Sequence, residues 1–189
     1  MIAIIAEKPS VGMDIARVVG ADTRNDGYCS GNGYMVTWAL GHLVSLATPD
    51  TYGYTKTAAE DLPMLPDPFR LVSRQMRTDR GMVTDIAASK QLKVIESVFN
   101  RCDSIIVATD AGREGELIFR WIYDFLGCTK PFRRLWISSL TDEAIRKGLE
   151  ELKDGSEYDS LYAAADSRAK ADWLVGMNAS RALALVSGS

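Results

Sequence analysis

The sequence has little of the material from which disulfide-linked, zinc-binding or membrane-spanning proteins are built. It contains three cysteines and one histidine in 189 residues. The cysteines are odd in number and far apart, so neither a disulfide framework nor a zinc site is indicated, and a reducing cytoplasm is the expected location. The apolar opening run, Ile2 to Ala6, is too short for a signal peptide or a membrane span. We therefore expect a soluble protein without a membrane partner.

The sequence also lacks an excess of positive charge. It has 22 Lys and Arg against 25 Asp and Glu, a formal net charge of -3. A small nucleic-acid-binding domain is usually basic, so any nucleic acid must be bound here by local patches or through a cation. Hydrophobic residues make up 47% of the chain, which is enough for a sizeable core in one domain with part of a second.

What the sequence does contain is a unit of strand, turn and helix that recurs three times. The units occupy residues 1–20, 104–127 and 134–154, each starting with a short apolar run and continuing with apolar residues at helical spacing. The third strand is predicted over Arg134 to Ser138, and Thr141 is a suitable N-cap for the helix that follows it. This alternation predicts an α/β, Rossmann-like fold whose mostly parallel sheet is flanked by helices.

The remaining segments are less regular. Residues 22–33 are polar and glycine-rich and predict a loop, and Tyr34 to Leu40 predicts a strand. Residues 48–69 hold four of the six prolines and predict an irregular excursion, followed by a short strand from Phe69 to Ser73. The arginines that come next are expected to form a solvated face; they are Arg70, Arg74, Arg77 and Arg80.

Two long helices complete the prediction. One runs from about Thr84 to Asn100, and the other is alanine-rich and spans residues 157–185. The second helix would leave the first domain, so we place a domain boundary at Asp154, with domains over 1–154 and 155–189. The single histidine, His42, has no partner motif and is expected to be structural. Core positions are expected for the four tryptophans, Trp38, Trp121, Trp136 and Trp173.

Acidic side chains directly follow two of the predicted strands. Glu7 follows the first strand, and Asp110, Glu114 and Glu116 follow the strand that begins at Ser104. Because parallel strands end at the same edge of a sheet, we expect Glu7 and Asp110 to lie close together. Carboxylates that gather in this way repel one another, and a divalent cation relieves the repulsion. The hard oxygen ligands favour Mg²⁺, which points to phosphate chemistry.

The same residues also have a purely structural interpretation. Asp110 can cap the helix that follows it, and Glu114 and Glu116 can be favoured by the dipole of that helix. Glu7 and Lys8 can form a solvated pair. Spacing alone leaves both interpretations open.

Three segments carry a more specific pattern. Ile4–Ser10 reads Ile-Ile-Ala-Glu-Lys-Pro-Ser, Thr109–Glu116 reads Thr-Asp-Ala-Gly-Arg-Glu-Gly-Glu, and Ala171–Leu183 reads Ala-Asp-Trp-Leu-Val-Gly-Met-Asn-Ala-Ser-Arg-Ala-Leu. In this order they resemble the type IA DNA topoisomerases, in particular the bacterial topoisomerase III group, over essentially the whole chain. The resemblance implies that residues 1–154 are a Toprim domain and that residues 155–189 begin a helical DNA-binding domain of a longer enzyme.

The acidic turn alone is less specific than the three segments together. Primases, certain nucleases and recombination proteins also carry a Toprim domain. A Toprim nuclease or primase-like protein therefore stays open as an alternative, and so does a non-catalytic nucleic-acid-binding module.

The resemblance implies a reaction. In the family a tyrosine attacks one DNA strand and forms a 5′-phosphotyrosine, a second strand passes through the gap, and the break is resealed without ATP. Glu7 matches the glutamate that assists proton transfer at the 3′ oxygen, and Lys8 matches the lysine that stabilises charge on the scissile phosphate. Arg113 stands beside the acidic positions and joins these two as a predicted catalytic residue.

The resemblance also implies a metal and a DNA partner. Asp110 and Glu114 match the first and third positions of the family's Asp-x-Asp-x-Glu turn, whereas Gly112 stands at the second position. We therefore expect one Mg²⁺ held by Glu7 and Asp110, with Glu114 as the third member of the metal site. Positions near the family's groove for single-stranded DNA are matched by Arg168, Asp172 and Arg181.

The attacking tyrosine is not found among the seven tyrosines of the chain. In the family it lies in a later domain. The chain alone is therefore expected to be unable to cleave or relax DNA. Its expected partners are single-stranded DNA and the remaining domains of the same enzyme, and a monomer is expected.

Overall fold

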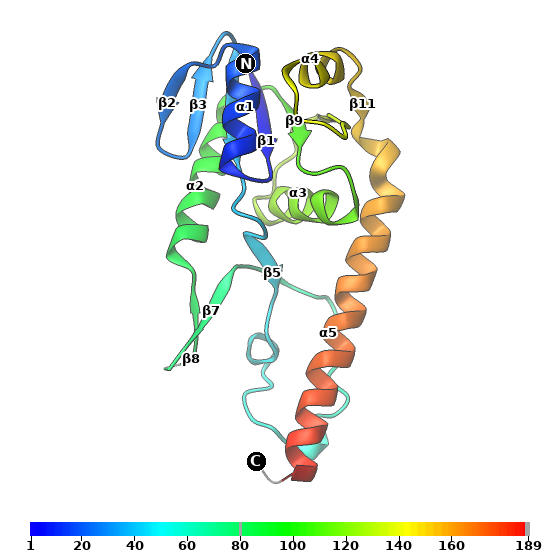
Figure 1. Cartoon of the computed structure of the whole chain (residues 1–189). Helices are drawn as coiled ribbons and strands as arrows, with labels where there is room; N and C mark the ends of the chain where they lie inside the picture. Colours follow the sequence, from blue (N-terminus) through cyan, green and yellow to red (C-terminus); the bar gives the residue numbers. More distant parts are fainter. Residues whose placement is uncertain (80, 188–189) are drawn as a thin grey trace.

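A seven-stranded sheet forms the centre of the fold (Figure 1). The computed structural model describes residues 1–79 and 81–187. The strands lie in the order β11-β10-β9-β1-β4-β3-β2. Their bounds are β1 Ile2–Ala6, β2 Thr23–Asn25, β3 Tyr28–Gly31, β4 Tyr34–Trp38, β9 Ser104–Ala108, β10 Phe132–Arg134 and β11 Lys153–Asp154. The four central strands are parallel and β2, β3 and β11 are antiparallel edges, which confirms the mostly parallel α/β fold.

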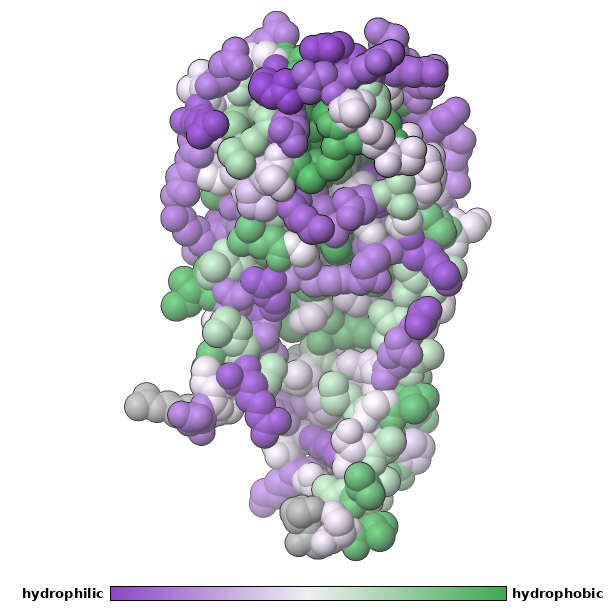
Figure 2. Space-filling model, in the orientation of Figure 1, coloured by the Kyte–Doolittle hydropathy of each residue, from purple (hydrophilic) through white to green (hydrophobic). Residues whose placement is uncertain are grey.

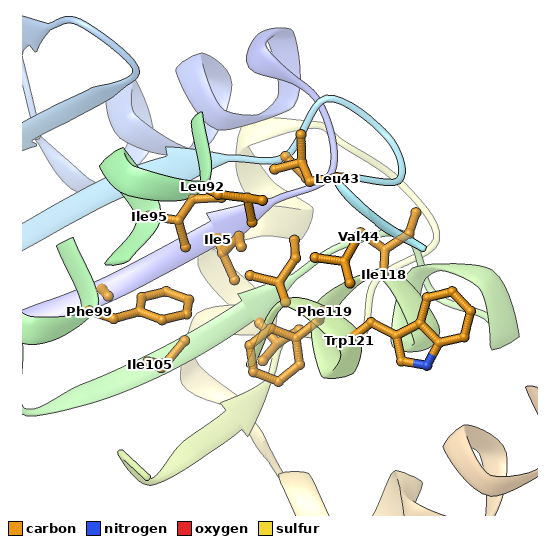
Figure 3. Packing of buried hydrophobic residues seen from close by; sticks show 14 of the residues in the cluster. Ile5, Leu43, Val44, Leu92, Ile95, Phe99, Ile105, Ile118, Phe119 and Trp121 are labelled. Carbon is orange, nitrogen blue, oxygen red and sulfur yellow. The ribbon is translucent and has the colours of Figure 1, made fainter. Parts of the chain in front are cut away.

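Helices cover both faces of this sheet. One face packs against α2 (Ile86–Arg101) and α3 (Arg113–Phe125), and the other packs against α1 (Pro9–Val19) and α4 (Asp142–Glu150). Strand β1 alternates between the two cores because successive side chains of a strand point to opposite faces. Ile5 lies in the core under α2 and α3, whereas Ile4 lies in the core under α1. Figure 3 shows the first core, with Phe99 and Phe119 around Ile5 and Ile105.

Local signals start and stop the helices as predicted. Pro9 occupies the first turn of α1, and Gly20 ends that helix with a left-handed φ of 76°. The Thr141 hydroxyl accepts a hydrogen bond from the Ala144 amide at 3.3 Å and caps α4. The predicted helix over residues 84–100 is confirmed as α2, to within two residues at each end.

Some strand predictions were wrong. Residues 22–33 are not a loop, because they contain the hairpin of β2 and β3, whose outer strand is fully exposed and carries no apolar alternation. The third parallel strand is β10 at 132–134, so the predicted strand over 134–138 begins two residues too late and runs four residues too far. The arginine-bearing segment contains a second hairpin, β7 (Gln75–Thr78) with β8 (Gly81–Thr84), while Arg80 lies outside the described residues.

The predicted irregular excursion is largely confirmed. It lies between β5 (Val44–Leu46) and β6 (Leu71–Ser73), which pair with each other, and it contains two short 3-10 helices at Pro49–Tyr52 and Ala59–Asp61. The predicted long helix is α5 (Asp159–Ser187), which follows the 3-10 turn Gly155–Tyr158 and runs down one side of the molecule (Figure 1).

Helix α5 leaves the sheet and packs along the excursion. The Trp173 indole donates to the Ala47 carbonyl at 2.8 Å, and the Asn178 amide group bonds both the N–H and the C=O of Met64. The end of α5 carries exposed apolar side chains, including Leu183 and Val186. Figure 2 shows hydrophobic residues at the lower end of the molecule. The predicted domain boundary at Asp154 falls between β11 and the turn that leads into α5, and it stays a prediction.

The tryptophans differ in how deeply they are buried. Trp121 and Trp173 are buried, as predicted, whereas Trp136 is 40% exposed and stacks on Tyr158, so its predicted core position was wrong. No helix within residues 1–79 and 81–187 combines the length and the apolar character that a membrane crossing requires.

Candidate active site

Two acidic segments meet at the carboxyl edge of the sheet. Strands β1 and β9 are parallel neighbours in which Ala6 lies opposite Ala108, so Glu7 and Asp110 leave the sheet side by side. The Asp110 amide donates a hydrogen bond to Glu7 Oε2 at 3.1 Å, across 103 positions of sequence. The expected proximity of Glu7 and Asp110 is confirmed.

The Asp110 carboxylate does not cap the helix that follows it. The N-cap of α3 is Gly112, and no side chain caps that helix. Within residues 1–79 and 81–187, no hydrogen bond or ion pair engages the Asp110 carboxylate, and the residue is exposed. The interpretation of Asp110 as a capping residue was therefore wrong, and its carboxylate is available to a ligand.

Two glycines of the turn have different reasons to be there. A Cβ at Gly115 would lie 2.0 Å from the Asp110 carbonyl oxygen, so the first turn of α3 can approach Asp110 only with glycine at this position. The Thr109 hydroxyl donates to the Gly115 carbonyl at 2.7 Å and holds this approach. A Cβ at Gly112 would meet nothing within 4 Å, so a side chain fits there.

A buried arginine holds the main chain of the turn from behind. Arg134 is 1% exposed, and its Nη1 donates to the carbonyls of Val107 at 3.0 Å and Thr109 at 2.7 Å. Its Nη2 donates to the Asp110 carbonyl at 2.8 Å. Burial lowers the pKa of the guanidinium, and the neighbouring Glu116 opposes that shift. Since its ordinary pKa is far above neutral, Arg134 stays charged.

The partner of Arg134 is Glu116, which is also 1% exposed. Glu116 Oε2 lies 3.0 Å from Arg134 Nε, and Glu116 Oε1 accepts from Arg120 Nε at 2.9 Å. Glu116 does lie in the first turn of α3, where the helix dipole favours an acidic residue, as the structural interpretation predicted. It is a buried carboxylate between two arginines.

Glu114 points to a different neighbour. Its carboxylate pairs with His42 Nε2, and the His42 ring lies edge-on to Trp121 with centroids 6.2 Å apart. The pair lines an open cleft of about 470 Å³ between α3 and α5. The same cleft is lined by three of the predicted site residues, Arg113, Arg168 and Asp172.

Two of the three predicted DNA-binding residues lie in this cleft. Arg168 Nε is 3.8 Å from Asp172 Oδ2, and both side chains are exposed on α5. Arg181 lies further along α5, where its guanidinium donates to the carbonyls of Tyr54 at 2.5 Å and Lys56 at 2.7 Å. The structure brings Arg168 and Asp172 together and places Arg181 on the excursion.

The acidic edge brings together two residues that carry carboxylates, Glu7 and Asp110. Among the residues that the structure describes, no three His, Cys, Asp or Glu side chains form a group able to hold a metal ion. Glu7 and Asp110 fit Mg²⁺, which proteins usually hold by one or two carboxylates together with water and substrate phosphates. The remaining predicted residues, Lys8 and Arg113, are exposed beside them.

Comparison with known proteins identifies the family. The Toprim domain matches residues 2–140. The chain belongs to the Toprim family.

Two curated relatives of this Toprim chain carry the same name. It is 50% identical over 185 residues to "DNA topoisomerase 3" of Shouchella clausii and 48% identical over 184 residues to "DNA topoisomerase 3" of Bacillus subtilis. These matches cover 96% and 95% of this chain but only 24% of each relative. The chain therefore spans about a quarter of the length of the curated relatives it matches.

The chain is also similar to solved structures. Full-length topoisomerase I from Thermotoga maritima aligns with a TM-score of 0.49 and 18% identity, over 80% of this chain and 21% of that chain. The α/β fold of the Toprim chain is established by its own strand order and does not depend on this match.

Two contacts around the acidic turn were not predicted from the sequence. His42 was expected to be structural, yet it contacts the predicted metal residue Glu114. Its position directly after β4, a neighbour of β1, was the available signal. Arg134 and Glu116 were not recognised as a pair, because nothing in their spacing shows that both are buried.

Two of the tyrosines are engaged in structural contacts. The Tyr123 hydroxyl donates to the Lys130 carbonyl at 2.8 Å, and the Tyr162 hydroxyl donates to Asp124 at 3.0 Å. Burial raises the pKa of both phenols, which makes them poorer nucleophiles.

Proposed function

We propose that this chain is the N-terminal Toprim part of a type IA DNA topoisomerase 3 and supplies the acidic half of its active site. The remaining domains of the same enzyme would supply the tyrosine. The observation that carries the proposal is the hydrogen bond from the Asp110 amide to the Glu7 carboxylate. It joins the two segments whose sequences resemble the family's catalytic motifs, and the relatives that match nearly the whole chain are named DNA topoisomerase 3.

The proposed reaction is a reversible exchange of phosphodiester bonds. The tyrosine oxygen bonds to phosphorus and gives its proton to water, and the bond from phosphorus to the 3′ oxygen breaks. Glu7 gives a proton to the departing 3′ oxygen and takes it back when the strand is resealed. Lys8 and Arg113, which are both exposed, stabilise negative charge on the phosphate.

The proposed metal is Mg²⁺, and Glu7 and Asp110 would hold it. When bound, the ion would neutralise charge on the scissile phosphate. Glu114 lies one helical turn from these carboxylates and pairs with His42, so we place it at the margin of the metal site, facing the cleft. Arg168 and Asp172 would contact single-stranded DNA in that cleft, whereas Arg181 would act there through the placement of α5. The proposed location is the cytoplasm, and the proposed state is a monomer.

A chimeric enzyme tests this function. The matching quarter of the Bacillus subtilis relative is replaced by this chain, and relaxation of negatively supercoiled plasmid is measured with Mg²⁺. We expect the chimera to relax DNA, an Asp110→Asn chimera to fail, and an Asp26→Asn chimera to retain activity. Asp26 is a suitable control because it lies in the turn between β2 and β3, at the far edge of the sheet, and pairs with Lys90 of α2.

The isolated chain provides the complementary test. We expect it neither to relax nor to nick plasmid DNA, because Tyr123 and Tyr162 are held in structural contacts. Nicking or primer synthesis by the chain alone would favour a Toprim nuclease or a primase-like protein. A folded chimera without activity would favour a non-catalytic module.

A further inference from the structure

The main-chain N–H and C=O of Asp110, in the acidic turn, are both hydrogen-bonded to side chains. The Asp110 N–H donates to Glu7, and the Asp110 C=O accepts from Arg134 Nη2 at 2.8 Å. Gly115 closes the third side, because its Cα approaches the Asp110 carbonyl so closely that a Cβ would overlap it. These contacts fix the main chain from which the Asp110 side chain projects.

Arg134 is suited to this task by its shape. Its forked guanidinium reaches three main-chain acceptors, the carbonyls of Val107, Thr109 and Asp110, as β9 ends and the turn begins. A lysine ammonium has no planar fork and would not reproduce these directions. Because Arg134 is 1% exposed, its charge needs a buried partner.

Glu116 provides that partner by charge rather than by a hydrogen bond. Glu116 Oε2 lies 3.0 Å from Arg134 Nε, yet the contact lacks hydrogen-bond geometry, and neither atom has a hydrogen-bonded partner among the residues described. The other oxygen, Oε1, accepts from Arg120, whose Nη2 donates to Asp159 at the start of α5 at 2.7 Å. Glu116 therefore links the turn, through Arg134, to the start of α5, through Arg120.

We propose that Arg134 and Glu116 are positioning residues that aim the Asp110 carboxylate at Glu7, so that the two carboxylates form one cation site. The inference rests on the proposed role of Glu7 and Asp110 in holding Mg²⁺. Neither positioning residue touches the metal or the DNA. They act through the main chain of residues 107–110.

Charge and geometry make opposite predictions for Arg134, which allows a clean test. Arg134→Gln removes a positive charge from behind the carboxylates, so charge alone would tighten cation binding. Loss of positioning would weaken it. The probe is Mn²⁺, and the fall of the free Mn²⁺ signal in electron paramagnetic resonance reports its affinity for the whole chain.

We expect Arg134→Gln and Glu116→Gln each to weaken Mn²⁺ binding on the order of tenfold, as is typical when partners behind a metal ligand are removed. The double variant Arg134→Gln/Glu116→Gln leaves no unpaired charge in the core and should regain stability. Its Mn²⁺ affinity should stay low. Val98→Ala, a truncation in the buried face of α2, is the control for general destabilisation and should bind Mn²⁺ as the wild type does.

Two results would overturn the inference. One is Mn²⁺ binding by Arg134→Gln as tight as, or tighter than, that of the wild type. The other is recovery of affinity in the double variant together with its stability. If the wild type itself binds no Mn²⁺, the proposed metal role fails, and hydrogen exchange of the Asp110 amide then decides the positioning role alone. That amide should exchange faster in Arg134→Gln than in Val98→Ala at equal global stability, and equal rates would refute positioning.

Discussion

Replacing Gly115 by alanine is expected to damage the turn although alanine favours helices. Gly115 lies in the first turn of α3, where its Cα faces the main chain of Asp110. An added Cβ would lie 2.0 Å from the Asp110 oxygen, 2.8 Å from its carbonyl carbon and 2.9 Å from its nitrogen. All three are backbone atoms, so no side-chain rotation relieves the overlap. Either α3 or the turn has to move.

The size of the effect follows from two opposing terms. Alanine in place of glycine within a helix stabilises by up to about 1 kcal/mol. Overpacking a rigid site costs about 1–3 kcal/mol, and here the cost should be at the upper end or beyond because the Arg134 hydrogen bonds resist movement of the turn. We expect a net loss of about 2 kcal/mol in the free energy of unfolding. For a chain of this size that lowers the melting temperature by about 4–8 °C.

Thermal and urea unfolding of the whole chain measure this loss. The matched control is Gly176→Ala, because Gly176 lies inside α5 and a Cβ there meets nothing within 4 Å. That control should gain up to about 1 kcal/mol from helix propensity. If Gly115→Ala were as stable as the wild type or more stable, the close approach of α3 to Asp110 would be refuted.

Three further predictions concern the parts around the turn. Asn178→Ala should cost about 3 kcal/mol in urea unfolding, because the N–H and C=O of the fully buried Met64 both lose their partner; a loss below 1 kcal/mol would contradict the docking of the excursion on α5. Hydrogen bonds from the first-turn amide of α2 and from Arg74 lower the pKa of Asp85, so its contribution to stability is present above its unfolded pKa and is lost as the pH falls through the folded pKa. Asp85→Asn should therefore reduce the loss of unfolding free energy that the wild type shows as the pH falls. An unchanged pH dependence would refute the stabilising role of the Asp85 carboxylate. Gly112→Asp should fit without a clash and, as an N-cap, stabilise α3 by a few tenths of a kcal/mol. It should also tighten Mg²⁺ binding. An unchanged Mg²⁺ affinity would show that the second acidic position does not face the metal.

The parts of the fold that the sequence predicts are those in which burial produces a pattern. Strands β1 and β9 are apolar on both faces because helices cover both sides of the sheet, and α1 carries proline and glycine at its two ends. The β2–β3 hairpin was missed because its residues are polar, and an edge strand facing solvent needs no apolar alternation. Trp136 was assigned to the core from its place near a strand, but β10 ends at Arg134 and leaves Trp136 outside the sheet.

The site was predictable where topology alone determines it. Parallel strands bring Glu7 and Asp110 to one edge whatever the intervening residues do. The partners that hold the turn were not predictable, since a buried ion pair such as Glu116 with Arg134 resembles two ordinary surface charges in sequence. Their burial depends on the packing of α3 against β10, and the local sequence pattern does not predict that packing.

The most direct test of the central claim is a Mg²⁺ titration of the isolated chain followed by amide chemical shifts. Glu7 and Asp110 should respond together at millimolar Mg²⁺ and with one affinity, because the Glu7 carboxylate contacts the Asp110 main chain at the shared sheet edge. Asp110→Asn should abolish the response at both positions. Shifts that leave residues 7 and 110 unchanged, or that persist in Asp110→Asn, would contradict the assignment of this edge as the cation-binding half of the active site.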